Sequence, residues 1–124
     1  IIRTVTPNGG LNIATHSFDY SAAFSRNIGW VTEPEQATLR SARIAIAGLG
    51  GVGGAHLLTL SRLGIAQFNI ADFDHFEVHN FNRQAGASMP FLGQPKVDVL
   101  AQLALDVNPE ADLRRFTQGV TPEN

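Results

Sequence analysis

A glycine-rich segment at residues 48–53 (GLGGVG) carries the strongest chemical signal in the sequence. It follows a short apolar run and precedes residues with helical spacing, which is the context in which such a segment binds a nucleotide. The glycines at its first, third and sixth positions allow a tight turn, a close approach of backbone to ligand, and close helix–strand packing. Free amides and the positive helix end then attract an anion. We therefore expect Gly48, Gly50, Gly51 and Gly53 to bind a nucleotide.

An aspartate stands where a nucleotide site of this kind would need it. Asp72 comes nineteen positions after Gly53, at the end of a second apolar run. A carboxylate about twenty positions on holds the ribose hydroxyls in dinucleotide-binding domains. The alternative is that the glycines only form a turn and Asp72 only ends a strand. Because the position, the helix and the carboxylate agree, we favour a nucleotide site, and its nucleotide stays open at this point.

Two basic side chains follow the second apolar run. Lys96 is the only lysine, and it begins a predicted helix, where its positive charge opposes the helix dipole. This position suggests a nearby anion, although a lysine with its head in water is the more common arrangement. Arg83 lies thirteen residues earlier, in the segment 80–84 (NFNRQ). An arginine fork and a compact ammonium both suit phosphate oxygens, so together with the glycine loop they would surround a triphosphate.

The elements that must position these residues alternate between strands and helices. Strand, helix and strand follow one another within about 30 residues, as in a right-handed parallel crossover. The first strand is a nearly continuous apolar run, so we expect it to be buried on both faces. A capping box predicts a further helix upstream. The predicted elements are helix 33–41, strand 43–49, helix 51–63 ended by Gly64, strand 67–73, helix 96–107 and strand 113–116.

This order predicts an α/β fold with a Rossmann-like parallel sheet flanked by helices. Residues 1–23 are expected to form an extended N-terminal arm with a turn at residues 7–10, and residues 24–124 to form the Rossmann-like portion. Between the second strand and the next helix lies a loop of some twenty residues, a length that is typical of functional loops. His75 and His79 lie in it, but we expect no metal site there because the segment does not read as helical.

The composition limits the possible functions. The chain has 124 residues, nine basic against eleven acidic side chains, and no cysteine. The net charge gives no overall attraction to nucleic acid or to an anionic membrane, so we expect neither as a partner. Without cysteine, neither a thiolate nucleophile nor a cysteine zinc site can form here. No apolar run approaches the roughly 20 residues of a membrane span, and we expect a cytoplasmic protein.

Taken together, these residues resemble a known family. Arg26, the loop 48–53, Asp72, the segment 80–84 and the segment 93–96 (GQPK) occur in the order and spacing of the ThiF/MoeB/HesA adenylyltransferases, relatives of the ubiquitin-activating enzymes. The resemblance covers roughly residues 24–118. It implies that the chain is the N-terminal half of a ubiquitin-activating-enzyme-like domain, incomplete at its C-terminus.

The resemblance also implies an activity. Members of the family bind ATP and Mg²⁺ and attach AMP to a carboxylate, usually the C-terminal glycine of a ubiquitin-fold carrier protein, with release of pyrophosphate. Asp72 would hold the ribose, and Asn80, Arg83 and Lys96 would contact the phosphates, while Arg26 would reach the ATP of the partner subunit in a homodimer. The family's Mg²⁺-binding aspartate is expected outside this chain, so the fragment alone is expected to be inactive.

Two other functions remain open from the sequence. An NAD-binding domain of an oxidoreductase would share the glycine loop and Asp72, but it has no use for Asn80, Arg83 and Lys96 in this arrangement. A non-catalytic scaffold of the same family would keep the fold without the full set of basic residues. Retention of that set favours the adenylyltransferase.

Overall fold

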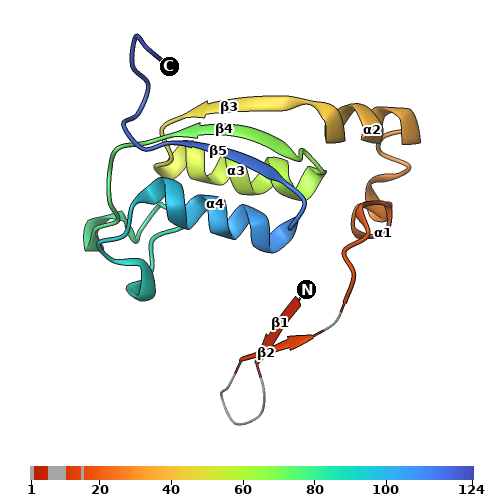
Figure 1. Ribbon diagram of the computed structural model, residues 1–124, viewed down its shortest axis with the longest axis horizontal. Coiled ribbons are helices and arrows are strands. Elements are labelled where there is room, and N and C mark those ends of the chain that lie inside the picture. The colour runs from red at the N-terminus through yellow and green to blue at the C-terminus, as the bar shows by residue number, and fades with distance from the viewer. Residues whose placement is uncertain (1, 6–10, 15) are drawn as a thin grey trace.

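The computed structural model describes residues 2–5, 11–14 and 16–124. Near the N-terminus, β1 (Ile2–Val5) and β2 (Leu11–Ala14) pair as antiparallel strands, with Ile2 opposite Ala14. In Figure 1 this small sheet lies apart from the larger one. The expected extended arm therefore contains two paired strands, and the turn predicted at residues 7–10 lies outside the described residues.

The segment that leads into the larger sheet is built from short helices. α1 (Tyr20–Ala23) and a 3-10 helix η1 (Ser25–Asn27) precede α2 (Glu33–Ser41). The start of α2 has the predicted capping box: the Thr32 hydroxyl accepts from the Glu35 amide at 3.2 Å, and the Glu35 carboxylate accepts from the Thr32 amide at 3.0 Å. These two bonds satisfy amides that would otherwise lack partners, so the helix begins where the sequence predicts.

The larger sheet has three parallel strands in the order β3 (Arg43–Ala47), β4 (Gln67–Ala71) and β5 (Asp112–Phe116). α3 (Gly51–Leu63) connects β3 to β4, and α4 (Lys96–Val107) leads into β5. Both helices cover the same face of the sheet (Figure 1). Gly64 ends α3 in the left-handed region at φ +102°, as predicted. The α/β, Rossmann-like parallel sheet flanked by helices is therefore confirmed.

The core lies between the sheet and these two helices. Each strand turns alternate side chains toward the helices, and each helix turns its apolar stripe toward the sheet. The fully buried members of this core come from β4, α3, α4 and the loop after β4 and include Leu57, Phe68, Ile70, Phe76, Val97, Leu100, Ala101 and Ala104. Of the helices in the described ranges, none has the length and apolar character needed to cross a membrane.

The face of the sheet opposite α3 and α4 differs from the prediction for the first strand. Ala45 and Ala47 of β3 are exposed, so the expectation that this strand is buried on both faces was wrong for the described chain. The reason is that the two crossover helices lie on one face. On the uncovered face, Arg43 donates to the Asn69 side chain at 2.9 Å and also pairs with Asp112 across the three strands. Polar cross-strand pairs of this kind keep a solvated face stable without apolar cover.

Candidate functional site

The glycine loop between β3 and α3 needs glycine at its first and last positions for different reasons. Gly48 has φ +87°, a backbone conformation that side chains disfavour, and its amide donates to the Ala71 carbonyl at 2.7 Å. A Cβ on Gly53 would lie 1.8 Å from the carbonyl oxygen of Gly48. The loop therefore has the tight turn and the close helix–strand approach that the sequence predicts.

Asp72 ties this loop to the end of β4. Its Oδ2 accepts from the Leu49 amide at 2.7 Å, and its Oδ1 accepts from the Asp74 amide at 2.7 Å. The half-buried carboxylate thus orders the glycine loop and the segment after β4 at the same time. Each carboxylate oxygen has a further lone pair that can accept a hydroxyl proton. The role of Asp72 toward a ribose stays a prediction.

The long loop after β4 folds back on itself and brings Lys96 to the site. It contains two 3-10 helices, η2 (Val78–Asn80) and η3 (Met89–Phe91). The Phe76 amide donates to the Gln94 carbonyl at 3.0 Å, the Gly93 amide donates to the Phe76 carbonyl at 2.9 Å, and the Phe76 ring is buried. The start of α4 is thereby held beside the end of β4.

Lys96 is an ammonium group taken largely out of water. Its side chain is 7% exposed, and its Nζ lies 4.0 Å from Oδ2 of Asp74 and 5.7 Å from the centre of the Phe76 ring. The main chains of the two residues are also hydrogen-bonded, since the Lys96 amide donates to the Asp74 carbonyl at 2.9 Å. A buried charge is stable only when it is paired and hydrogen-bonded, and a carboxylate at 4.0 Å satisfies this only in part. The arrangement leaves Lys96 able to bind a further anion.

Asn80 ends η2, and Arg83 follows it in the same loop. The buried Asn80 caps its own segment, because its Oδ1 accepts from the Glu77 amide at 2.8 Å. The exposed Arg83 donates from Nη1 to the His79 carbonyl at 3.1 Å. A Cβ on Gly51 would lie 3.4 Å from Cγ of Arg83, so this arginine packs against the first turn of α3.

Arg26 is not part of this cluster. It is exposed on η1, and the neighbouring Asn27 donates to the Leu63 carbonyl at 3.1 Å. Leu63 ends α3, whereas the glycine loop begins it, and a helix of 13 residues is about 20 Å long. The structure therefore links the glycine loop directly to Asp72 and Arg83, with Asn80 in the same loop as Arg83. Lys96 is linked to Asp74, two residues after Asp72, whereas Arg26 lies at the far end of α3.

Sequence reasoning missed one buried polar residue at the site. Gln84 is 6% exposed, and within the described residues its Oε1 has no hydrogen-bond partner. A Cβ on Gly50 would lie 3.6 Å from Nε2 of Gln84, so the amide packs directly against the glycine loop. Its place in the segment 80–84 was the signal in the sequence, but no periodicity marks a glutamine as buried.

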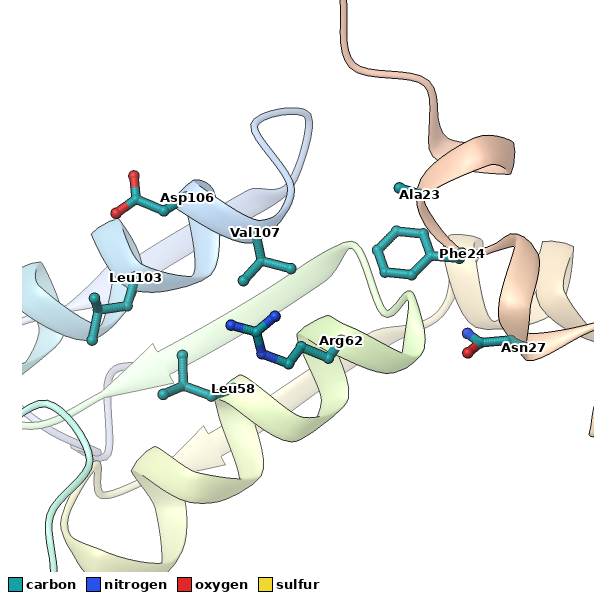
Figure 2. A pocket seen from close by; sticks show the side chains of 8 residues that line it. All are labelled: Ala23, Phe24, Asn27, Leu58, Arg62, Leu103, Asp106 and Val107. Atoms are coloured by element: carbon teal, nitrogen blue, oxygen red, sulfur yellow. The ribbon is translucent and has the colours of Figure 1, made fainter. Parts of the chain in front are cut away.

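A separate hollow lies at the other end of the two helices, between α3, α4 and the segment of α1 and η1 (Figure 2). It encloses about 520 Å³, and Leu58, Arg62, Asp106 and Val107 are among the residues that line it. None of its described lining residues belongs to the predicted site. Across residues 2–5, 11–14 and 16–124, no group of three histidine or acidic side chains could hold a metal ion.

Comparisons with known proteins identify the family of the chain. The model of the ThiF family matches residues 24–124. The chain is 36% identical over 100 residues to tRNA threonylcarbamoyladenosine dehydratase of Bacillus subtilis, covering 81% of the chain and 39% of that relative. It is 38% identical over 74 residues to molybdopterin-synthase adenylyltransferase of Salmonella typhimurium, covering 60% of the chain and 30% of that relative.

A solved structure of Escherichia coli tRNA N6-threonylcarbamoyladenosine dehydratase in complex with ATP matches with a TM-score of 0.82 and 30% identity. The match covers 87% of this chain and 44% of that one. This chain therefore spans less than half the length of these relatives. Because the family model matches most of the chain, including the glycine loop, the long loop and the start of α4, the chain belongs to the ThiF family.

Proposed function

We propose that this chain is the nucleotide-binding portion of an ATP-dependent adenylyltransferase that activates a carboxylate as its acyl-adenylate. The observation that carries the proposal is the incompletely paired Lys96 ammonium, which is 7% exposed and lies 4.0 Å from Asp74, two residues after the Asp72 that accepts from the glycine loop. Arg83 packs on the first turn of α3 and adds a second cation. An NAD site needs no such pair of cations, whereas a triphosphate does.

The proposed chemistry needs fixed positive charge more than it needs a base. A carboxylate oxygen of the substrate attacks the α-phosphorus of ATP, a new O–P bond forms, and the bond from the α-phosphorus to the bridging oxygen breaks as pyrophosphate leaves. Negative charge builds up on the phosphorus centre and on pyrophosphate, and preorganised cations stabilise it. The carboxylate is already ionised at neutral pH, so no side chain has to remove a proton.

The backbone amides of Gly48, Gly50, Gly51 and Gly53 would lie against the nucleotide, and Asp72 would accept from the ribose hydroxyls. Asn80, Arg83 and Lys96 would contact the phosphates. Arg26 lies at the far end of α3 and would reach the ATP of a partner subunit, so we propose a homodimer.

Mg²⁺ takes carboxylate and phosphate oxygens as ligands. The site contains Asp72 and Asp74, but both oxygens of Asp72 already accept backbone amides, and Asp74 faces Lys96. These carboxylates fit Mg²⁺ poorly on their own. We propose that ATP carries the ion into the site and that a further ligand lies outside this chain.

The substrate class we propose is the C-terminal carboxylate of a ubiquitin-fold carrier protein. The relatives include a molybdopterin-synthase adenylyltransferase and a tRNA threonylcarbamoyladenosine dehydratase. Activation assays on the full-length protein therefore need two arms, one with carriers that end in glycine and one with modified tRNA. If tRNA stimulates the activation of ATP and the carriers do not, the substrate is a nucleic acid and not a carrier protein.

The test is ATP–pyrophosphate exchange in the full-length protein. Arg83→Ala and Lys96→Ala should each lower exchange by about 100-fold or more, because each removes a cation from the charge that develops in the transition state. Arg62→Ala is the matched control, since Arg62 lines the distal hollow and should leave exchange unchanged. Unchanged exchange in both site variants, or binding of NAD instead of ATP in calorimetric titration, would refute the proposal.

A further inference from the structure

The carbonyls at the C-terminal end of α3 accept hydrogen bonds from side chains of the segment that precedes the larger sheet. The Leu63 carbonyl accepts from Nδ2 of Asn27 at 3.1 Å and from Nε2 of Gln36 at 3.0 Å. The Gly64 carbonyl accepts from the Tyr20 hydroxyl at 2.6 Å. The last carbonyls of a helix have no partner inside the helix. α1, η1 and α2 are therefore attached to the end of α3 by side chains that satisfy these carbonyls.

These three side chains also bind one another, so they form one network. Nε2 of Gln36 donates to the Tyr20 hydroxyl at 2.9 Å, and Oε1 of Gln36 accepts from Nδ2 of Asn27 at 3.1 Å. Gln36 and Tyr20 are buried, and a side chain on Gly64 would collide with both. Buried hydrogen bonds are directional and costly to break. The network therefore holds the segment in one position on α3, whereas apolar contacts alone would let it slide.

Arg26 lies inside the segment that this network holds. It is the middle residue of η1, and Asn27 follows it directly. On its other side the buried Phe24 has its ring 4.7 Å from that of Tyr20. A 3-10 helix of three residues has too few hydrogen bonds to fix its own position, so these contacts fix the backbone of Arg26. Its side chain is exposed and makes no ion pair within the described residues, which leaves the guanidinium free.

We propose that Tyr20, Asn27 and Gln36 are positioning residues, which hold Arg26 where it reaches the nucleotide of the partner subunit. The inference rests on the proposed function, in which Arg26 acts across a homodimer. A cation stabilises a developing charge best when it is in place before the reaction, and a displacement of about 1 Å can lower a rate by about 100-fold. The network supplies this placement because it ties the Arg26 backbone to α3, the helix that begins at the glycine loop.

The test uses mixed dimers of the full-length protein, in which the two subunits carry different affinity tags and are purified through both. Lys96→Ala silences the site of its own subunit, so each dimer keeps one working site. Asn27→Ala removes both bonds from Nδ2 and is placed either in the subunit with Lys96→Ala or in the other subunit. Both arrangements contain the same two substitutions, so a general loss of stability affects them alike.

ATP–pyrophosphate exchange should depend on the arrangement. With Asn27→Ala in the subunit that has the working site, that site still receives a well-placed Arg26, and exchange should equal that of a dimer with Lys96→Ala alone. With both substitutions in one subunit, the working site meets a displaced Arg26, and exchange should be about 10-fold to 100-fold lower. Ser25→Ala is the matched control on η1, because the Ser25 hydroxyl donates within the segment, to the Ala22 carbonyl at 2.9 Å. It should lower exchange in neither arrangement.

Equal exchange in the two arrangements would overturn the inference, and so would a loss confined to dimers with Asn27→Ala in the subunit that has the working site. The same two arrangements with Arg26→Ala in place of Asn27→Ala test the step on which the inference depends. If they do not differ, or if the two tagged subunits do not copurify, the action of Arg26 across a dimer fails and the inference fails with it. If the unsubstituted protein shows no exchange, the proposed function itself fails before any variant is made.

Discussion

Replacing Gly53 by alanine sets two physical effects against each other. Gly53 lies inside α3, and in a helix interior alanine is more favourable than glycine by about 1 kcal/mol. A Cβ at this position, however, would lie 1.8 Å from the Gly48 carbonyl oxygen, whereas real Cβ contacts are essentially never under 3.0 Å. The glycine loop would have to move by more than an ångström, and backbone atoms cannot rotate out of the way as a side chain can.

That movement breaks hydrogen bonds whose lengths are known. The Gly48 amide donates to the Ala71 carbonyl at 2.7 Å, and the Leu49 amide donates to the Asp72 carboxylate at 2.7 Å. The first is worth about 1 kcal/mol and the second, to a charged group, about 2 kcal/mol. After subtracting the gain in helix propensity, Gly53→Ala should lower the free energy of unfolding by about 2 kcal/mol.

Gly51→Ala is the matched control in the same helix turn. A Cβ there would lie 3.4 Å from Cγ of Arg83, an ordinary contact, so its stability should change little or rise slightly. Thermal and urea unfolding should be followed by far-UV circular dichroism, because the single tryptophan, Trp30, is 92% exposed and its fluorescence would change little. Gly53→Ala with a stability equal to or above that of the unsubstituted protein would refute the steric argument.

Two further outcomes follow from side-chain bonds elsewhere in the chain. Gln36→Met removes the bonds that the buried Gln36 amide makes to Tyr20 at 2.9 Å and to the Leu63 carbonyl at 3.0 Å, and urea unfolding should show a loss of about 1–3 kcal/mol; a loss below 0.5 kcal/mol would contradict this. The hydrogen bond from Arg43 holds the pKa of Asp112 below its usual range. Its stabilising contribution is therefore present above about pH 4 and is lost as the pH falls through the lowered pKa. Asp112→Asn should make Tm fall less steeply below pH 4, and an unchanged slope would argue against the pairing.

Local signals in the sequence predicted most of the described fold. α2, α3 and α4 begin and end at the predicted residues, because a capping box, a left-handed glycine and the asparagine–proline pair at residues 108–109 act within one turn of the chain. The parallel strands were also predicted, with ends that differ by one to two residues. The end of a strand depends on the backbone hydrogen bonds that its neighbouring strand can make. The sequence of one segment does not determine those bonds.

The features that escaped prediction depend on contacts between distant segments. The exposure of Ala45 and Ala47 could not be read from an apolar run, because it is decided by which face the crossover helices cover. The burial of Gln84 could not be predicted for the same reason. It comes from the packing of the long loop against the glycine loop, where Gly50 lies 34 residues upstream.

Lys96 has both a local signal in the sequence and an unusual tertiary environment, because its position combines several features that destabilise a lysine. Its charge opposes the dipole at the start of α4, its side chain is buried, and its only ion pair within the described residues is a carboxylate at 4.0 Å. Stability alone would favour an uncharged residue here, since replacing a poorly paired buried charge is often neutral or stabilising. Departures from local rules are expected where function requires them. An anion bound beside Lys96 would relieve these costs together, so the proposed phosphate site would account for this lysine better than the ion pair with Asp74 alone does.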